Sequence, residues 1–288
     1  MRDIISGKTT ICGLIGDPVE HTMSPIMHNA AFKTLGLDYV YLPFKVKSLE
    51  LRKAVEGMRA LNIRGLNVTL PHKVSVMQFL DKIDPLAEKI GAVNTIVNDA
   101  GILTGYNTDA HGFLQALHDQ DIEIGNKRVL LIGAGGVARA IGCSLAQEKA
   151  QINVLNRKQE LSWAEELAHR LNHYYGIDIN IGELTDENLQ KGIDDAEILI
   201  NATSIGMNPD IDHTPIPANL LCANLTIFDV VYNPLQTRLL REAEMAGART
   251  IDGVKMLVWQ GAIAFEKWTN QQAPLDIMRE TVKSLLAE

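Results

Sequence analysis

The segment from Arg128 to Lys149 constrains the fold more than any other part of this 288-residue chain. It begins with an apolar run, Arg128–Ile132, which has the length and composition of a buried strand. A glycine-rich stretch follows, and Val137–Lys149 then has helical spacing. The stretch Gly133-Ala134-Gly135-Gly136-Val137-Ala138 fits G-x-G-x-x-G/A, in which the glycines allow a tight turn and a close approach to a pyrophosphate. We therefore predict that its residues bind a dinucleotide: Gly133, Ala134, Gly135, Gly136 and Val137.

Two alternatives stay open for this loop, a connection that binds nothing and an adenosylmethionine site. The residues after the next expected strand, Ile152–Leu155, indicate the cofactor type. NAD-binding domains carry Asp or Glu there to hold the ribose 2′-hydroxyl. This chain instead has Asn156-Arg157-Lys158, with no acid before Glu160. Cations suit a 2′-phosphate, so the pattern favours NADP(H) over NAD, although a solvated helix start would look the same.

Strand and helix signals alternate through most of the chain, which predicts an α/β fold with a parallel sheet. We expect an N-terminal α/β substrate domain, a Rossmann-type doubly wound dinucleotide-binding domain, and a cleft between them. Residues 1–108 would form the substrate domain, completed by C-terminal helices in 254–288, and residues 109–253 the NADP-binding domain.

Composition narrows the function classes. The net charge of −8 argues against nucleic acid or an acidic membrane as a partner. Three widely spaced cysteines form neither a disulfide framework nor a zinc-ligand set, and we expect no metal. The longest apolar runs are strand-sized and no signal region follows Met1, so a cytoplasmic protein is expected.

Candidate catalytic residues follow the expected strand Gly65–Leu70. Alternation points Asn67 and Thr69 to the same side, and Pro71 would start a helix with Lys73 in its first turn. An ordinary surface lysine is the plain alternative. Asp109 would open a helix, where it could serve only as the N-cap, and Asn94 could be a structural hydrogen-bonding residue.

A helix start is also expected at Ser24-Pro25, with Ser24 as N-cap and Pro25 at the first helical position.

The chain resembles the shikimate dehydrogenase family, with matching segments in the family's order from Gly13 to Gln260. The segments before the glycine loop are Gly16–Pro25, Asn67–Lys73, Gly91–Thr95 and Gly105–Asp109. Those after it are Asn201–Met207, Asp229–Pro234, and Asp252-Gly253 through Gln260.

The resemblance implies reduction of 3-dehydroshikimate to shikimate with NADPH, in the pathway to aromatic amino acids. It implies that Lys73 and Asp109 form the catalytic acid–base pair at the reacting oxygen. The implied substrate contacts are Thr22 and Ser24 at the carboxylate, Tyr232 nearby, and Asn67, Thr69, Asn94 and Gln260 at ring hydroxyls. The implied contacts at the nicotinamide end of the cofactor are Thr203, Ser204, Met207, Val230 and Gly253.

Two departures from the family pattern bear on specificity. Thr22 stands where the biosynthetic enzymes usually have Ser, which leaves quinate activity open. The family's NADP pattern, Asn-Arg-Thr-x-x-Arg, reads here from Asn156 to Leu161, so Leu161 replaces the last Arg and Lys158 adds a charge.

Two rival functions follow from the same resemblance: a quinate/shikimate dehydrogenase that uses NAD, and a regulatory protein that kept the fold and lost catalysis. The presence of both Lys73 and Asp109 argues against the second. The expected partner is a small-molecule substrate, and a homodimer is left open.

Overall fold

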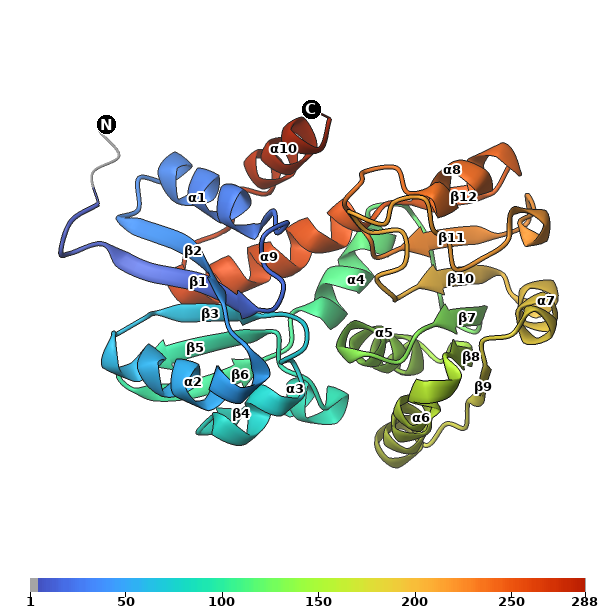
Figure 1. Ribbon diagram of the computed structural model, residues 1–288, viewed down its shortest axis with the longest axis horizontal. Coiled ribbons are helices and arrows are strands. Elements are labelled where there is room, and N and C mark those ends of the chain that lie inside the picture. The colour runs from blue at the N-terminus through green and yellow to red at the C-terminus, as the bar shows by residue number, and fades with distance from the viewer. Residues whose placement is uncertain (1–4, 288) are drawn as a thin grey trace. The chain divides into compact units, whose positions relative to one another are not determined.

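The computed structural model describes residues 5–287 and confirms the predicted α/β class (Figure 1). Its residues divide into two units. The first unit contains the described residues up to Thr108, together with Val258–Leu285. The second unit runs from Asp109 to Leu257, and the last described residues, 286 and 287, are grouped with it. The return to the first unit therefore lies inside one helix, α9 (Gly253–Thr269).

The first unit is built on a mixed sheet with the strand order β2-β1-β3-β5-β6-β4. Its strands are β1 (Thr10–Gly16), β2 (Tyr39–Lys45), β3 (Gly65–Val68), β4 (Lys82–Ile83), β5 (Thr95–Asp99) and β6 (Ile102–Tyr106). β1 pairs in parallel with β2 and β3, whereas β5 is antiparallel to β3 and β6. The β5–β6 hairpin turns at Ala100 and Gly101, both at positive φ, as a two-residue type I′ loop requires.

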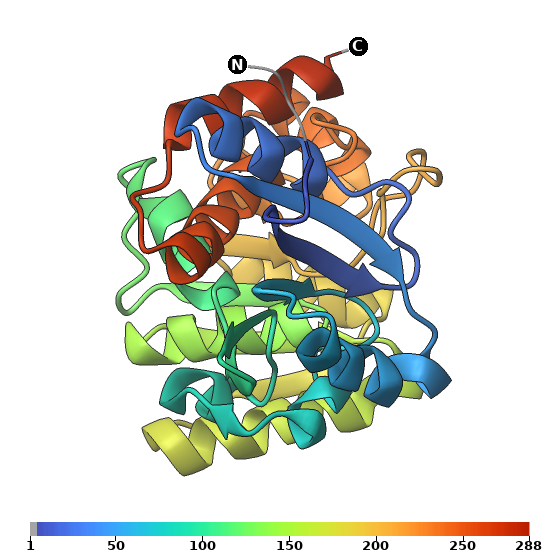
Figure 2. The same cartoon turned by 90° about the vertical axis from the view of Figure 1, so that its left-hand side faces the viewer.

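Helices cover both faces of this sheet, as Figure 2 shows. They are α1 (Ser24–Thr34), α2 (Leu51–Ala60), α3 (Pro85–Ile90), α9 and α10 (Leu275–Leu286), with 3₁₀ turns η1 (Ser48–Glu50) and η2 (Ser75–Phe79). α2, α3 and η2 pack on one face over an aliphatic core, and α1 and α9 pack on the other. At Gly65 an added Cβ would lie 1.9 Å from Nε1 of Trp268, so only glycine fits beneath α9.

The second unit is built on a sheet in which all strand pairs are parallel, with the order β12-β11-β10-β7-β8-β9. The strands are β7 (Arg128–Ile132), β8 (Gln151–Asn156), β9 (Asn180–Glu183), β10 (Ile198–Asn201), β11 (Thr226–Asp229) and β12 (Arg249–Ile251). Counted from β7, this is the 3-2-1-4-5-6 order of a dinucleotide-binding Rossmann fold. The order reverses between β7 and β10, where such folds bind their ligands.

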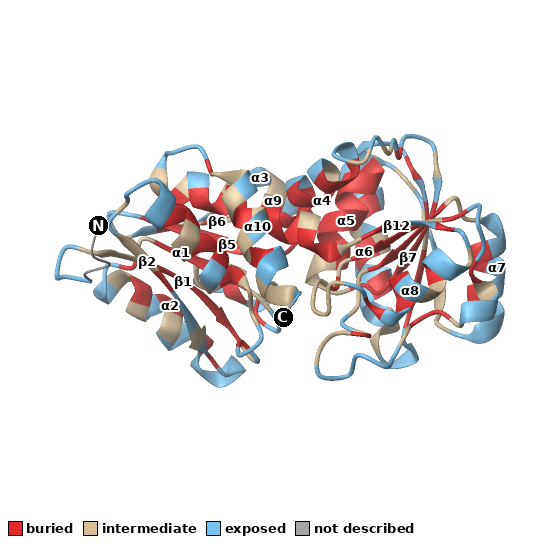
Figure 3. Cartoon of the chain, turned by 90° about the horizontal axis from the view of Figure 1, so that it is seen from above, coloured by how far each residue is buried: buried red, intermediate tan, exposed pale blue. Residues whose placement is uncertain are grey.

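Five α-helices belong to the second unit before α9: α4 (Asp109–His118), α5 (Gly136–Gln147), α6 (Leu161–Tyr175), α7 (Asp186–Asp195) and α8 (Arg238–Met245). Two 3₁₀ turns, η3 (Lys158–Glu160) and η4 (Ala218–Leu220), complete it. Leucine and isoleucine side chains of α7 and α8 join those of β7, β10 and β11 in one core. Right-handed crossovers in the two directions from β7 place α5 and α6 on the opposite face. Figure 3 shows the central strands buried between these layers.

The structure corrects the prediction that Ser24 is an N-cap. Helix α1 begins at Ser24 itself, the cap position is Met23, and Pro25 lies in the first turn. The Oγ1 atom of Thr22 accepts a hydrogen bond from the Ser24 N–H at 3.3 Å. Thr22 therefore supplies the hydroxyl at this helix start.

The structure also corrects the placement of Lys73 in a first helical turn. Lys73 lies in a turn before η2. The His72 N–H donates to the Thr69 carbonyl at 2.9 Å, and the Lys73 carbonyl accepts from the Val93 N–H at 2.8 Å. The His72 ring also contacts the Val46 carbonyl, with Nε2 at 2.6 Å. Of these bonds, the one from Val93 is tertiary and takes the Lys73 carbonyl, which a helix starting at Pro71 would offer to the N–H of Met77; that N–H instead donates to the Val74 carbonyl at 3.3 Å.

Candidate functional site

The glycine loop of the second unit connects β7 to α5 at the point where the strand order reverses. Gly133 has a φ of 102°, and an added Cβ would lie 3.0 Å from Thr203 Cγ2 and 3.1 Å from the Ala202 carbonyl oxygen. A Cβ on Gly135, by contrast, would meet nothing within 4 Å. Gly135 is the cap residue of α5 and provides no side-chain cap bond. The first N–H groups of α5 are therefore suited to a phosphate, and the loop fits a dinucleotide.

A buried polar network fixes the strand ends beside this loop. Asn201, at the end of β10, donates through Nδ2 to Asp229 Oδ1 at 2.9 Å. Asn201 Oδ1 in turn accepts from the backbone N–H and the hydroxyl of Thr203, at 3.1 and 2.7 Å. Asp229 also accepts from the Val231 N–H at 3.0 Å and from the Thr237 hydroxyl at 2.7 Å. The network shapes the two segments that contain Thr203 and Val230.

Burial raises the pKa of Asp229 to about 6, although its three hydrogen bonds act in the opposite direction. Within this region Thr203, Met207, Val230 and Tyr232 are half-buried, Ser204 is exposed, and Gly253 is buried at the start of α9. Sequence reasoning did not single out Asp229 or Asn201 for this role. The sequence signal that could have indicated this network is an Asn and an Asp at the ends of adjacent parallel strands.

The end of β8 contains the residues that are expected to contact the ribose of the cofactor and its 2′ substituent. Asn156 is buried, and Arg157 and Lys158 are exposed. Arg157 forms an ion pair with Glu160, with Nη2 2.5 Å from Oε1 and Nε 3.1 Å from Oε2. The sequence shows a cation and an acid three residues apart, but not that they pair at the strand end.

In the first unit, a hydrogen-bonded group of polar residues surrounds Asn67. This group, the Asn67 cluster, consists of Asn67, Tyr41, Asn94, Thr95 and Gln260. Asn67 Oδ1 accepts from the Tyr41 hydroxyl at 2.7 Å, and its Nδ2 donates to the Asn94 carbonyl at 3.2 Å and the Thr95 hydroxyl at 3.1 Å. Asn94 Nδ2 lies 3.4 Å from Oε1 of Gln260 on α9. Three of the predicted substrate residues, Asn67, Asn94 and Gln260, are thereby brought together. Tyr41 is not among the residues predicted from the sequence, because nothing in its local sequence indicates that its hydroxyl bonds to Asn67.

The other candidates have distinct surroundings. Thr69 follows β3, and its N–H donates to the Ile15 carbonyl at 3.0 Å. Ser24 is buried and Thr22 half-buried ahead of α1, while Lys73 is half-buried in its turn. Asp109 is the buried first residue of α4. Just before it, the Thr108 N–H donates to Asn94 Oδ1 at 2.8 Å, so the chain that leads to Asp109 is tied to the Asn67 cluster.

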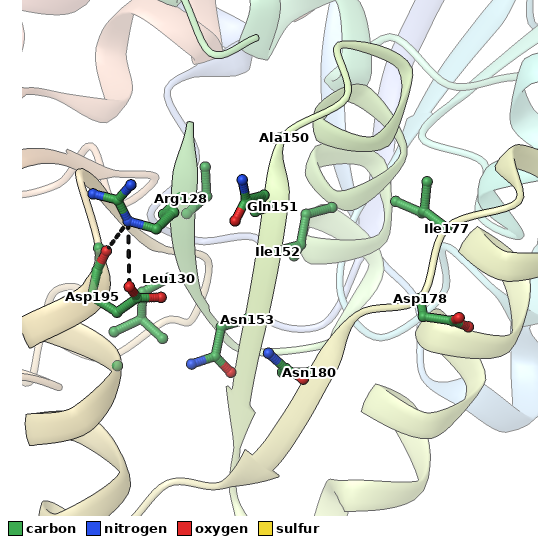
Figure 4. Close-up of a pocket in the computed structure, with 13 residues that line it drawn as sticks. Arg128, Leu130, Ala150, Gln151, Ile152, Asn153, Ile177, Asp178, Asn180 and Asp195 are labelled. Carbon is green, nitrogen blue, oxygen red and sulfur yellow. Dashed lines mark hydrogen bonds and ion pairs between the residues drawn. The ribbon is translucent and has the colours of Figure 1, made fainter. Parts of the chain in front are cut away.

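A separate pocket of about 430 Å³ lies at the amino ends of β7, β8 and β9, and is therefore at the opposite edge of the sheet from the glycine loop (Figure 4). Arg128, Gln151 and Asn180 line it, and Arg128 is held by the backbone and side chain of Asp195. Parallel α/β sheets bind ligands at the carboxyl ends of their strands. This pocket is not the candidate site.

Among residues 5–287, no helix is long and apolar enough to span a bilayer. No group of three or more His, Cys, Asp or Glu residues there is placed to hold a metal ion.

The strand order and glycine loop define a dinucleotide-binding α/β protein with a second, separately built α/β unit. Models of known protein families identify the class more specifically. Residues 14–96 match the shikimate dehydrogenase substrate binding domain, residues 116–213 match shikimate / quinate 5-dehydrogenase, and residues 253–283 match the shikimate 5′-dehydrogenase C-terminal domain.

Individual proteins give the same result. The chain is 46% identical over 276 residues to the shikimate dehydrogenase (NADP(+)) of Dehalococcoides mccartyi, covering 96% of each chain. A crystal structure of a shikimate dehydrogenase in complex with NADP+ is 41% identical, with a TM-score of 0.91 and coverage of 99% of this chain and 98% of the other. The shikimate 5-dehydrogenase of Listeria monocytogenes, in complex with shikimate and NAD, is 44% identical, with a TM-score of 0.87 over 96% and 97% of the two chains. This chain belongs to the shikimate dehydrogenase family.

Proposed function

We propose that this protein catalyses the reversible, NADPH-dependent reduction of 3-dehydroshikimate to shikimate. The observation that carries the proposal is near-full-length similarity to relatives named shikimate dehydrogenase (NADP(+)), together with the presence of Lys73 and Asp109 in the matching motifs. The product would serve the synthesis of aromatic amino acids. We further propose that the protein works in the cytoplasm.

Binding of the cofactor is assigned to the second unit. The N–H groups at the start of α5 would hold the pyrophosphate, and the segments at Thr203 and Val230 would line the nicotinamide end. Bound there, the cofactor supplies the hydride, so the protein's tasks are orientation and proton transfer. Arg157 and Lys158 support a preference for a 2′-phosphate because Arg binds phosphate oxygens with a planar fork of donors.

Proton transfer is assigned to Lys73 and Asp109. In reduction, the Lys73 ammonium would give a proton to the carbonyl oxygen of 3-dehydroshikimate. In oxidation, the pair would take the proton of the shikimate hydroxyl, and Asp109 would orient Lys73 and share the proton. Both steps are acid–base chemistry by groups that need no metal.

Recognition of the ring is assigned to the Asn67 cluster and to the hydroxyls ahead of α1. Both protons of the Asn67 Nδ2 amide already have acceptors, and one position on Oδ1 is taken by Tyr41. The remaining capacity of Asn67 is therefore to accept from a substrate hydroxyl. Thr22 and Ser24 would donate to the substrate carboxylate, and Thr69, Asn94, Tyr232 and Gln260 would complete the site.

One assay tests the proposal. Purified protein is mixed with 3-dehydroshikimate and NADPH, NADPH consumption is followed, and the product is identified by mass spectrometry. We expect stoichiometric conversion to shikimate. NADPH consumption that requires a different keto substrate would refute the assignment.

Quinate oxidation is the second candidate function, because the matching model over residues 116–213 describes shikimate / quinate dehydrogenases and Thr22 replaces the usual Ser. Quinate tested in the oxidation direction measures it directly.

A further inference from the structure

The ion pair between Arg157 and Glu160 occupies the place where a Rossmann domain distinguishes its cofactors. Two bonds join the pair, with Nη2–Oε1 at 2.5 Å and Nε–Oε2 at 3.1 Å. The Glu160 side chain is 22% exposed and the Arg157 side chain 63% exposed. The acid is therefore the more firmly enclosed partner.

Backbone bonds hold Glu160 at this position. β8 ends at Asn156, and the 3₁₀ turn η3 brings the chain back toward the strand end. The Glu160 N–H donates to the Arg157 carbonyl at 2.9 Å. The Glu160 carbonyl accepts from Asn156 Nδ2 at 2.7 Å. With both backbone groups fixed, the carboxylate reaches Arg157 at a small cost in conformational entropy.

The strand end thus carries two opposing signals. A carboxylate after the second strand accepts from the 2′-hydroxyl of NAD, and an Arg there binds the 2′-phosphate of NADP. The guanidinium fork presents the same paired N–H donors to a carboxylate and to a phosphate. A 2′-phosphate and Glu160 would therefore compete for one set of donors, and their negative charges would repel each other.

We propose that Glu160 is a specificity-determining residue that reduces the preference for NADP over NAD by competing with the 2′-phosphate for Arg157. NADP binding separates Arg157 from Glu160, whereas NAD binding leaves the ion pair intact and offers the carboxylate to the 2′-hydroxyl. This inference rests on the dinucleotide site of the proposed function.

The test measures binding of NADP+ and NAD+ to the full chain by isothermal titration calorimetry, with no substrate present. Glu160→Gln keeps the shape of the side chain and removes its charge. We expect it to bind NADP+ at least about fivefold more tightly, as loss of about 1 kcal/mol of competition predicts. NAD+ should bind equally well or more weakly. Unchanged NADP+ affinity, or equal tightening for both cofactors, would overturn the inference.

Glu187→Gln is the matched control. It removes the same charge from the same unit and breaks an exposed ion pair of 2.6 Å with Lys191 on α7. Both affinities should stay at the wild-type values. If this variant tightened NADP+ binding as much as Glu160→Gln, the effect would be general electrostatics and the inference would fall.

A double variant separates the mechanism from a structural effect. If Glu160 acts through Arg157, the gain from Glu160→Gln should largely vanish in an Arg157→Gln background, as a double-mutant cycle detects. A full gain in that background contradicts competition for Arg157. Absence of dinucleotide binding by the wild type would overturn the cofactor site itself, whereas binding that ignores residue 160 would overturn only the role of Glu160.

Discussion

The Tyr41 hydroxyl donates to Oδ1 of Asn67 at 2.7 Å, and both side chains are buried in the first unit. The bond joins an aromatic cluster to the polar one. Tyr41 stacks on His28 with ring centroids 4.5 Å apart, and Trp268 of α9 lies within 6.0 Å of the Tyr41 ring. Packing within the protein therefore holds Tyr41 in place, and through its hydrogen bond the Asn67 amide, without any ligand.

Tyr41→Phe should therefore weaken substrate binding although Tyr41 is not assigned a substrate contact. Loss of one hydrogen bond of about 0.5–1.5 kcal/mol leaves the Asn67 amide held only by its two Nδ2 bonds, and we expect the KM for shikimate to rise about 2- to 10-fold. The KM for NADP+ should not change. Steady-state kinetics measure both values.

Tyr39→Phe is the control for this variant, because it removes a hydroxyl from the same strand at a residue that packs on Phe32. An equal rise in the KM for shikimate in both variants would show that Tyr41 acts through general stability.

Lys73→Ala should lower kcat by at least about 100-fold, because positioned acid–base catalysis typically contributes about 10²–10⁴. Shikimate affinity should stay within severalfold of wild type, because a proton-transfer group acts mainly in the transition state. Lys82→Ala removes an exposed lysine of β4 in the same unit and should retain wild-type turnover. Wild-type turnover in Lys73→Ala would remove Lys73 from the mechanism.

Thr22→Val deletes one hydroxyl and keeps the side-chain volume. If Thr22 binds the substrate carboxylate, its loss should cost about 1.5–3 kcal/mol and raise the KM for shikimate roughly tenfold or more. The same hydroxyl accepts the Ser24 N–H, so a thermal melt should accompany the kinetics. Thr22→Ser keeps the hydroxyl and should retain shikimate activity, with a changed ratio of shikimate to quinate oxidation. An unchanged KM in Thr22→Val would exclude Thr22 from carboxylate binding.

The pH dependence of stability should reflect His28. Burial lowers the pKa of His28 to about 3, and both of its ring nitrogens lack hydrogen-bond partners among the described residues. An unfolded histidine binds a proton below about pH 6.5, whereas His28 in the folded protein stays unprotonated until the pH falls to its lowered pKa. His28 therefore leaves stability unaffected above that pH and lowers it as the pH falls toward 3, by at most about 1.4 kcal/mol per pH unit.

His28→Phe should remove this slope, measured as urea unfolding free energy at several pH values. The slope is the readout, so a constant packing cost in the variant does not matter. His213→Gln changes an exposed histidine and should keep the wild-type slope. A wild-type slope in His28→Phe would exclude His28 as its source.

Sequence patterns predicted the elements whose signals are local. The strand Arg128–Ile132 and the glycine loop that follows it were found because apolar runs and glycines act over a few residues. The helix Asp186–Asp195 and the edge strand Asn180–Glu183 were missed, since each exposes most of its surface and has few apolar residues.

Tertiary hydrogen bonds account for the remaining differences. Lys73 was placed in a helix because the bonds of its turn to Val46 and Val93 come from other parts of the chain. The Tyr41–Asn67 bond spans 26 residues and has no local signature. The family resemblance supplied the site residues as a set, but not the Glu160 that holds Arg157.

The most direct test of the central claim is a comparison of initial oxidation rates for shikimate and quinate, each with NADP+ and with NAD+. We expect shikimate with NADP+ to have the highest kcat/KM of the four combinations, and quinate to be the poorer substrate with either cofactor. A highest kcat/KM for quinate with NAD+, or no NADP+-dependent oxidation of shikimate, would refute the proposed function.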